Sequence, residues 1–114
     1  MDLTGDLLRG HTDAILLSIL QTQDSYGYEI NQRIFKQSNQ LFSLTEATLY
    51  TSFKRLEKDG YIVSYWKDGI NQVPRKYYSI TILGQEYLKK HIDSYHKATA
   101  VIQTFLGGTH GKED

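Results

Sequence analysis

The chain contains no cysteine, and this absence excludes two kinds of site. Without thiols there are no disulfides and no metal sites built from thiolates, and a reducing cytosol is compatible with such a composition. No apolar run approaches the roughly 18 to 20 residues that cross a bilayer, and the first residues lack the charged start, apolar region and cleavage site of a signal peptide. We therefore expect a cytoplasmic protein that is neither secreted nor membrane-spanning.

The sequence motifs of common enzymes are also missing. There is no Gly-rich phosphate loop, no HExxH and no GxSxG. His91 and His96 are five residues apart, about 140° around a helix, so they do not readily chelate one metal ion. His11 and His110 have no neighbouring pattern of ligands. We expect four solvated histidines, no cofactor, no metal and no enzymatic activity.

The formal net charge is zero, but the charges are unevenly distributed. Lys and Arg number 3 against 5 acidic residues in residues 1–44, 6 against 4 in residues 45–76, and 4 against 4 in the remainder. Clustered cations interleaved with Tyr, Thr, Asn and Gln are typical of a surface that binds nucleic acid. An ordinary solvated charged face is the alternative. At 114 residues, with 39% hydrophobic content, the chain suits one domain with a core and no second catalytic domain.

Two helices are predicted in the first half of the chain. Thr12 and Asp13 suit an N-cap or first turn. They precede an apolar cluster that indicates a mostly buried helix: Ala14, Ile15, Leu16, Leu17, Ile19 and Leu20. Residues 26–37 place their large apolar side chains close to one side of a second helix. The apolar connector at residues 41–44 is short and could pair briefly as a strand.

A third helix is predicted to begin at Thr45 and to end at Gly60, which suits a left-handed stop. Leu49, Phe53 and Leu56 recur at spacings of four and three and so share the core side. The opposite face is small near its start and basic further along, and its members are Ala47, Thr51, Lys54 and Lys58, flanked by Thr48 and Arg55. This pattern suits a helix that presents its first side chains to base edges in the major groove and its cations to phosphates.

Two strands and a polar loop follow. Residues 61–67 and 76–80 are aromatic and β-branched, which predicts a hairpin. Arg75 follows the chain's single proline on the basic flank of the loop, where we expect a phosphate contact. Tyr77 and Tyr78 point to opposite faces, so at least one belongs to the core. We expect Trp66 to pack as well.

Thr81 can cap a final helix. In it, residues spaced by four and three form a coiled-coil-like seam, namely Leu88, Ile92, Tyr95, Thr99, Ile102 and Leu106. Either the chain's own domain or a second copy covers this seam, and the helix is long enough to extend beyond a small domain. Residues from Gly107 onward suit a flexible tail. The order of elements, three helices, a hairpin and a last helix, describes a winged helix-turn-helix.

Four segments in order, LLRGHTDAILLSIL, YGYEI, LTEATLYTSFKRLEKDGYI and PRKYYSIT, resemble the sequence blocks of the PadR-like transcriptional regulators, in the smaller subfamily with a single C-terminal helix. The resemblance implies a mainly α fold with a small β-hairpin. It implies a winged helix-turn-helix with an N-terminal arm at residues 1–81, a dimerisation helix at residues 82–106 and a tail at residues 107–114. It further implies a homodimeric repressor that binds a roughly palindromic double-stranded DNA operator.

In that family the helix that matches Glu46 to Lys58 enters the major groove, and the loop that matches residues 68–75 touches the neighbouring backbone or minor groove. Carried over by position, the DNA-binding residues are Thr48, Tyr50, Thr51, Lys54 and Arg55 on the helix, with Arg75 and Lys76 at the base of the wing. Tyr50 lies about 100° from the core side, so it is equally well a boundary tyrosine. The wing DGINQVPRK is poorer in Gly and Arg than in many relatives, which leaves DNA contacts of Asn71 and Gln72 open.

Relatives in this family commonly respond to small aromatic or drug-like molecules, some of them held between the C-terminal helices and helix one. Tyr95 on the seam suits such a ligand, although it equally suits a plain dimer core. The apolar wall would comprise Ile15, Ile92, Tyr95, Ala98 and Ile102, with Asp13, Asn31 or His91 as polar partners. The alternative function is a winged-helix module that binds another protein and no DNA, but its third helix would need an exposed apolar stripe, which this one lacks.

Overall fold

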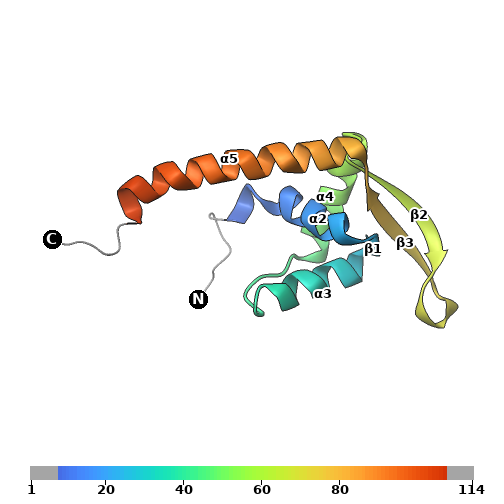
Figure 1. The fold of residues 1–114 in the computed structure, drawn as a ribbon. Helices are drawn as coiled ribbons and strands as arrows, with labels where there is room; N and C mark the ends of the chain where they lie inside the picture. Colours follow the sequence, from blue (N-terminus) through green and yellow to red (C-terminus); the bar gives the residue numbers. More distant parts are fainter. Residues whose placement is uncertain (1–7, 108–114) are drawn as a thin grey trace.

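The computed structural model describes residues 8–107 and shows four helices of two turns or more within that range, together with a small antiparallel sheet (Figure 1). The elements run α2 (Thr12–Thr22), β1 (Ser25–Tyr26), α3 (Gly27–Gln37), α4 (Glu46–Lys58), β2 (Ile62–Asp68), the short 3-10 turn η1 (Ile70–Gln72), β3 (Pro74–Ile80) and α5 (Ile82–Leu106). The predicted fold class, a mainly α winged helix-turn-helix with a β-hairpin, is confirmed. None of the helices within residues 8–107 is both long and apolar enough to span a bilayer.

The boundaries of α4 follow from its sequence. Thr45 is extended, and its Oγ1 accepts a hydrogen bond from the backbone N–H of Thr48 at 3.1 Å, which caps the helix as predicted. Gly60 has a φ of 80°, the left-handed conformation that a glycine adopts without strain. Between these ends, Leu49, Phe53 and Leu56 are buried.

The sheet has the strand order β1-β3-β2, with Tyr26 and Tyr65 both opposite Tyr77. The sequence did not predict β1, because two residues have no measurable periodicity, and the second helix accordingly begins at Gly27 rather than Tyr26. The connector at residues 41–44 is not a strand. Instead, the side-chain amide of Asn31 donates to the carbonyl of Leu44 at 2.7 Å and accepts from its N–H at 2.9 Å.

The core lies among α2, α3, α4, the sheet and the start of α5. Phe53 stacks on Tyr78 with ring centroids 4.0 Å apart, so Tyr78 is the core member of the tyrosine pair, as predicted for one of the two. The expectation that Trp66 packs is wrong, because its side chain is 69% exposed. Trp66 lies opposite Lys76, in the part of the hairpin that extends beyond the helices (Figure 1).

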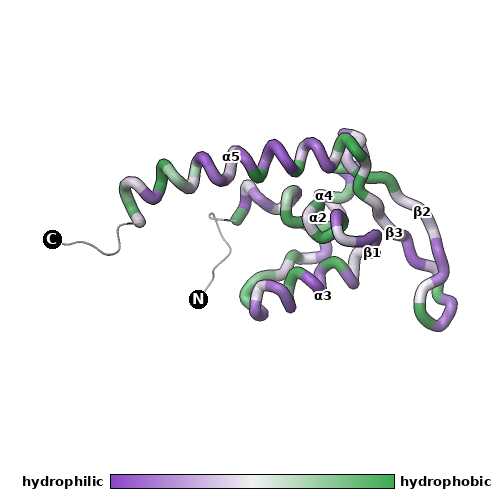
Figure 2. The backbone as a smooth tube through the Cα atoms, viewed as in Figure 1, coloured by the Kyte–Doolittle hydropathy of each residue, from purple (hydrophilic) through white to green (hydrophobic). Residues whose placement is uncertain are grey.

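Helix α5 starts on the core and then leaves it. Thr81 Oγ1 accepts from the N–H of Gly84 at 3.0 Å, the predicted cap. Leu88 is 2% exposed and belongs to the core of its own chain, so its predicted place in an intermolecular seam is wrong. Beyond it, α5 extends past the other helices (Figure 1), and hydrophobic residues recur toward its C-terminal end (Figure 2). The predicted arm and tail lie outside the described residues, apart from Leu8 to His11 and Gly107.

Candidate nucleic-acid interface

Helix α4 has three exposed sides with different neighbours. At 100° per residue, Ala47, Thr51, Lys54 and Lys58 face directly away from the core. Tyr50 and Glu57 flank this front face on the side of the sheet, where Ser64 Oγ donates to Glu57 Oε2 at 2.7 Å. Thr48 and Arg55 flank it on the other side, toward α2. The predicted DNA-binding residues of α4 are all exposed and lie on its front or on one of these two flanks.

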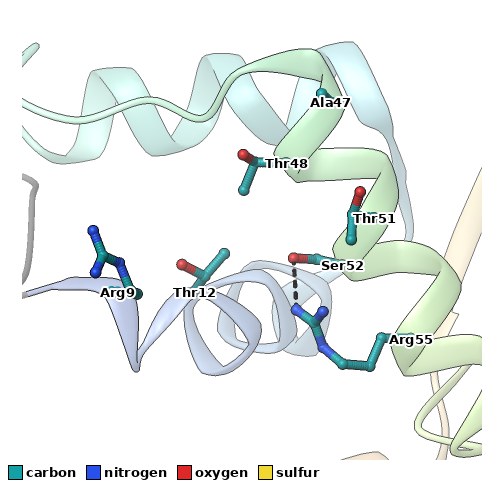
Figure 3. Close-up of a pocket in the computed structure, with 7 residues that line it drawn as sticks. All are labelled: Arg9, Thr12, Ala47, Thr48, Thr51, Ser52 and Arg55. Atoms are coloured by element: carbon teal, nitrogen blue, oxygen red, sulfur yellow. Dashed lines mark hydrogen bonds between the residues drawn. The ribbon is translucent and has the colours of Figure 1, made fainter.

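The flank that faces α2 borders a cleft of about 410 Å³ (Figure 3). The cleft is lined by Arg9, Thr12, Ala47, Thr48, Thr51, Ser52 and Arg55. In Figure 3, the side chains of Thr48, Ser52 and Arg55 extend from α4 toward the start of α2, where Arg9 and Thr12 lie. No sequence pattern predicted this cleft, because its two walls are about forty residues apart along the chain.

Arg55 is held in place rather than freely extended. Its Nε and Nη2 donate to the two carboxylate oxygens of Asp13 at 2.9 and 2.7 Å, and Nη2 also donates to Ser52 Oγ at 3.1 Å. The hydrogen bonds that Arg55 donates to Asp13 raise the pKa of Arg55, because the carboxylate stabilises the charged guanidinium. Asp13, predicted as a possible polar partner for an effector, is therefore occupied by an ion pair with Arg55 on α4.

Tyr50 is a boundary residue. Its side chain is 47% exposed, and its ring meets the ring of Phe53 edge-on at 5.5 Å. A Cβ added to Gly27 would lie 2.7 Å from the Tyr50 hydroxyl, so the glycine makes room for this ring at the start of α3. The ring is thus fixed from two sides, and nearly half of the residue remains open to a ligand.

At the wing, the cations lie over tyrosine rings. Arg75 lies over Tyr26 at 5.0 Å and Lys67 over Tyr77 at 4.6 Å on one face of the sheet. Arg75 therefore also has a structural role, because its guanidinium contacts Tyr26 in β1, a strand that the sequence did not reveal. Lys76 extends on the other face, 5.8 Å from the ring of Tyr78.

A row of tyrosines connects the three strands beneath these cations. Tyr77 contacts Tyr26 at 5.3 Å and Tyr65 at 5.8 Å between ring centroids. The hydroxyl of Tyr65 donates to Asp24 at 2.5 Å, and this hydrogen bond raises the pKa of Tyr65 to about 12. The base of the wing is therefore fixed to the segment that precedes α3.

The proposed effector region contains a pair of histidines. His11 Nδ1 and His91 Nε2 are 3.0 Å apart, and the ring of Tyr95 meets His11 edge-on at 5.5 Å. The expectation that all four histidines are solvated is wrong for these two, because α5 crosses the start of α2. Asn31 is also unavailable as a polar partner, since both ends of its amide bond Leu44.

The remaining effector and seam residues lie along α5. Ile92, Tyr95 and Ile102 are 43%, 46% and 53% exposed, and Ile15 on α2 is partly buried against the core. Ala98 and Leu106 are exposed and Thr99 is half-buried. A pocket of about 480 Å³ on α5 is lined by Lys89, Lys90, Ile92, Asp93 and His96. Among residues 8–107, no three His, Asp or Glu side chains gather as metal ligands would.

Known proteins resemble the chain in both sequence and fold. A family model, that of the transcriptional regulator PadR-like family, matches residues 16–90. A transcriptional regulator from Clostridium thermocellum is 41% identical, with a TM-score of 0.83 over 90% of this chain and 99% of that one. A PadR family regulator from Clostridium difficile is 32% identical, with a TM-score of 0.75 over 85% and 99% of the two chains.

An uncharacterized protein of Lysinibacillus sphaericus is 42% identical over 103 residues, which are 90% of this chain and 94% of that protein. The family match covers most of α2 through the first part of α5, which includes every element of the winged helix-turn-helix. The chain thus belongs to the PadR-like family of transcriptional regulators and has their winged helix-turn-helix DNA-binding fold.

Proposed function

We propose that this protein is a homodimeric, sequence-specific repressor that acts on DNA in the cytoplasm and is released by a small aromatic or drug-like ligand. The front of α4 carries the proposal, because small side chains at its start and cations further along suit entry into the major groove. In this proposal, residues 1–81 bind DNA, residues 82–106 dimerise and residues 107–114 form a tail.

The DNA-binding residues have different roles in the proposal. Thr48 and Thr51 reach base edges, because short hydroxyl side chains allow the helix to approach them closely. Lys54 binds phosphate. Tyr50 contacts DNA through the open part of its ring. Arg75 and Lys76 hold the wing to the neighbouring backbone, and the ring of Tyr26 limits the directions in which Arg75 can point.

Dimerisation would cover the apolar side of α5. Ile92, Tyr95, Thr99, Ile102 and Leu106 lie within about 80° of one another around the helix, a coiled-coil-like seam. Ile102 and Leu106 are more than half exposed in the single chain. An apolar row of this length in water is a site for association.

Ligand release would act at the same helix. Ile15, Ile92, Tyr95, Ala98 and Ile102 supply an aromatic and apolar surface beside the contact between α5 and the start of α2. A planar ligand inserted there would change the angle between α5 and the DNA-binding residues of its own subunit. A shift of a few ångströms misaligns the two subunits on half-sites one helical turn apart. To weaken operator binding about 100-fold, the ligand must bind the DNA-incompetent form more tightly than the DNA-competent form by roughly 2.7 kcal/mol.

The DNA-binding roles can be tested by fluorescence anisotropy on promoter fragments of the protein's own transcription unit and on random DNA. Arg75→Ala should weaken binding to both and reduce the slope of log affinity against log salt by about one, whereas Arg75→Lys should keep the slope. Thr51→Ala should change the preference between sites by about 1–3 kcal/mol. If no fragment binds, the protein is better explained as a protein-docking module. If Arg75→Ala leaves the salt slope unchanged, Arg75 does not contact a phosphate.

The ligand site can be tested by titrating planar aromatic compounds into the protein–operator complex. Wild type should release the operator as ligand fluorescence changes, and Tyr95→Ala should lose both responses. Tyr28→Ala is the matched control, because Tyr28 is an exposed tyrosine on α3 and should respond like wild type. If Tyr95→Ala and wild type respond equally, the protein has no ligand site at Tyr95.

A further inference from the structure

The cleft between α2 and α4 combines charge and hydroxyl groups that the sequence did not bring together. Arg9 and Arg55 line it along with the hydroxyls of Thr12, Thr48 and Thr51, and no acidic side chain is among its lining residues. Beside the cleft, the carboxylate of Asp13 binds Arg55 through both of its oxygens. Two guanidinium groups and three hydroxyl groups therefore line one space.

The ion pair orients Arg55 toward this space. Nε and Nη2 are engaged by Asp13 and by Ser52, whereas Nη1 has no hydrogen bond to any of residues 8–107. Ser52 is 1% exposed, so the guanidinium is anchored to a buried hydroxyl as well as to the carboxylate. A fixed guanidinium with one nitrogen left over is a directed donor for an anion.

The position of the cleft relative to α4 indicates which anion. If the front of α4 enters the major groove, the two phosphate backbones that border the groove pass along the two flanks of the helix. One flank faces the sheet and its wing. The other flank, with Thr48 and Arg55, forms a wall of the cleft (Figure 3). The wing can therefore hold one backbone, and the cleft lies where the second backbone would pass.

We propose that the cleft binds a phosphate of the operator backbone. Arg9 and Nη1 of Arg55 supply N–H donors, Thr12 supplies a hydroxyl donor, and Asp13 is a positioning residue that holds Arg55 toward the cleft. This inference rests on the proposed DNA-binding function, to which it adds a second phosphate contact on the side of α4 away from the wing. It also gives the start of α2 a direct part in DNA binding.

The test replaces single phosphates of an operator half-site by uncharged methylphosphonates and measures anisotropy with wild type and variants. For wild type, neutralising one phosphate on the side away from the wing should reduce affinity roughly tenfold, the size of one charge-assisted hydrogen bond. Arg9→Ala should bind the unmodified operator more weakly, and the same methylphosphonate should then cost little more. Thr12→Val should show a smaller coupling at the same phosphate.

Lys89→Ala is the control, because this exposed lysine on α5 lies outside both the cleft and the DNA-binding face. It should leave the full methylphosphonate effect in place. Asp13→Asn tests the positioning role. Because this variant loses a negative charge, it should bind random DNA more strongly. Because it also loses the ion pair that positions Arg55, the methylphosphonate at the cleft should reduce its operator affinity less than it does in wild type. A carboxylate that acted by charge alone would give the first effect without the second.

Two results would count against the cleft alone, and a third would count against DNA binding as a whole. If wild type binds the operator and one phosphate couples to Arg75, but none couples to Arg9 or Arg55, the proposed function stands and the cleft proposal is wrong. Inorganic phosphate can also be titrated at matched ionic strength while the amide NMR resonances of Thr48 and Thr51 are followed. If these resonances shift to saturation, but no operator phosphate couples to the cleft variants, the cleft is a site for free anions. If wild type binds no DNA, both proposals fail.

Discussion

The part of the chain that ends at Leu88 and the part of α5 beyond it use the same kinds of side chain with opposite results. Phe53, Leu56 and Leu88 are 1–2% exposed, whereas Phe105 and Leu106 are 78% and 80% exposed. In the first part, which we call the head (residues 12–88), several elements pack around a common core. Residues 92–106 lie beside the start of α2 only in their first turn, where Tyr95 contacts His11. Burial is thus decided by the neighbouring elements and not by the residue type.

The two parts also differ in what keeps them helical. The helices of the head are fixed by tertiary contacts and by caps such as Thr45. An isolated helix shorter than about 12–15 residues is marginal in water, so the outer part of α5 depends on its attachment to the head and on whatever covers it. A second copy of the chain is the cover that we propose.

The largest difference should appear between two phenylalanines. Phe53→Ala removes a ring that stacks on Tyr78, and a core truncation of this kind costs about 3–5 kcal/mol of unfolding free energy. Phe105→Ala should leave the unfolding of the separate subunit unchanged, because this residue is 78% exposed. Urea unfolding followed by circular dichroism over a wide range of protein concentration measures both. Equal losses would mean that Phe105 has a partner within its own chain.

The next prediction concerns Ile102. Wild type should sediment at twice its monomer mass of 13.2 kDa, and Ile102→Asp should sediment as a monomer, because a charge in the seam would be desolvated without a partner. Thr104→Asp places the same charge on the far side of the helix and should remain dimeric. A monomeric wild type at micromolar concentration would contradict the proposed dimer.

A smaller effect is expected where α5 joins the head. A Cβ at Gly84 would overlap the backbone carbonyl of Tyr61 and lie 2.9 Å from a side-chain carbon of Ile80, so Gly84→Ala should shift α5 and cost about 1–3 kcal/mol of unfolding free energy. Gly10→Ala is the matched control, since no atom lies within 4 Å of an added Cβ there. Thermal unfolding of the two variants provides the comparison. Equal stability would show that the junction adjusts freely.

The smallest effect should appear at high pH, and again in the head. Burial raises the pKa of Tyr78 to about 12, and the hydrogen bond to Asp24 raises that of Tyr65 to about 12 as well. Both pKa values exceed the unfolded value of about 10, so the folded state favours the neutral phenols. Their stabilisation is complete below pH 10 and is lost as the pH rises from 10 to 12. Ultraviolet titration of tyrosinate, with Tyr78→Phe and Tyr65→Phe for assignment, would detect this. Ionisation of both near pH 10 would disprove it.

The sequence was sufficient for features that depend on neighbours in the chain. The caps at Thr45 and Thr81 and the left-handed Gly60 lie where local patterns predicted them, because each requires only a few consecutive residues. The core side of α4 followed from helical periodicity for the same reason. The front face of α4 is exposed as expected, while its contact with DNA remains a prediction.

Contacts between distant segments could not be predicted in this way. Asp13 and Arg55 are 42 residues apart and His11 and His91 are 80 apart, and no periodicity relates them. Strand β1 was missed because it is defined only by its pairing with β3. Trp66 was misjudged because residue type suggested burial, whereas the hairpin extends past the helices that would have covered it.

The start of α2 places three consecutive residues against three different parts of the molecule. His11 contacts His91 on α5, Thr12 lines the cleft and Asp13 binds Arg55 on α4. Thermodynamic linkage between binding sites is reciprocal, so a ligand at α5 that weakens DNA binding through this turn must itself be weakened by DNA to the same degree. The operator would then compete with the effector without sharing its site. The ligand affinities of the free and the DNA-bound protein would differ by the same factor by which the ligand weakens operator binding.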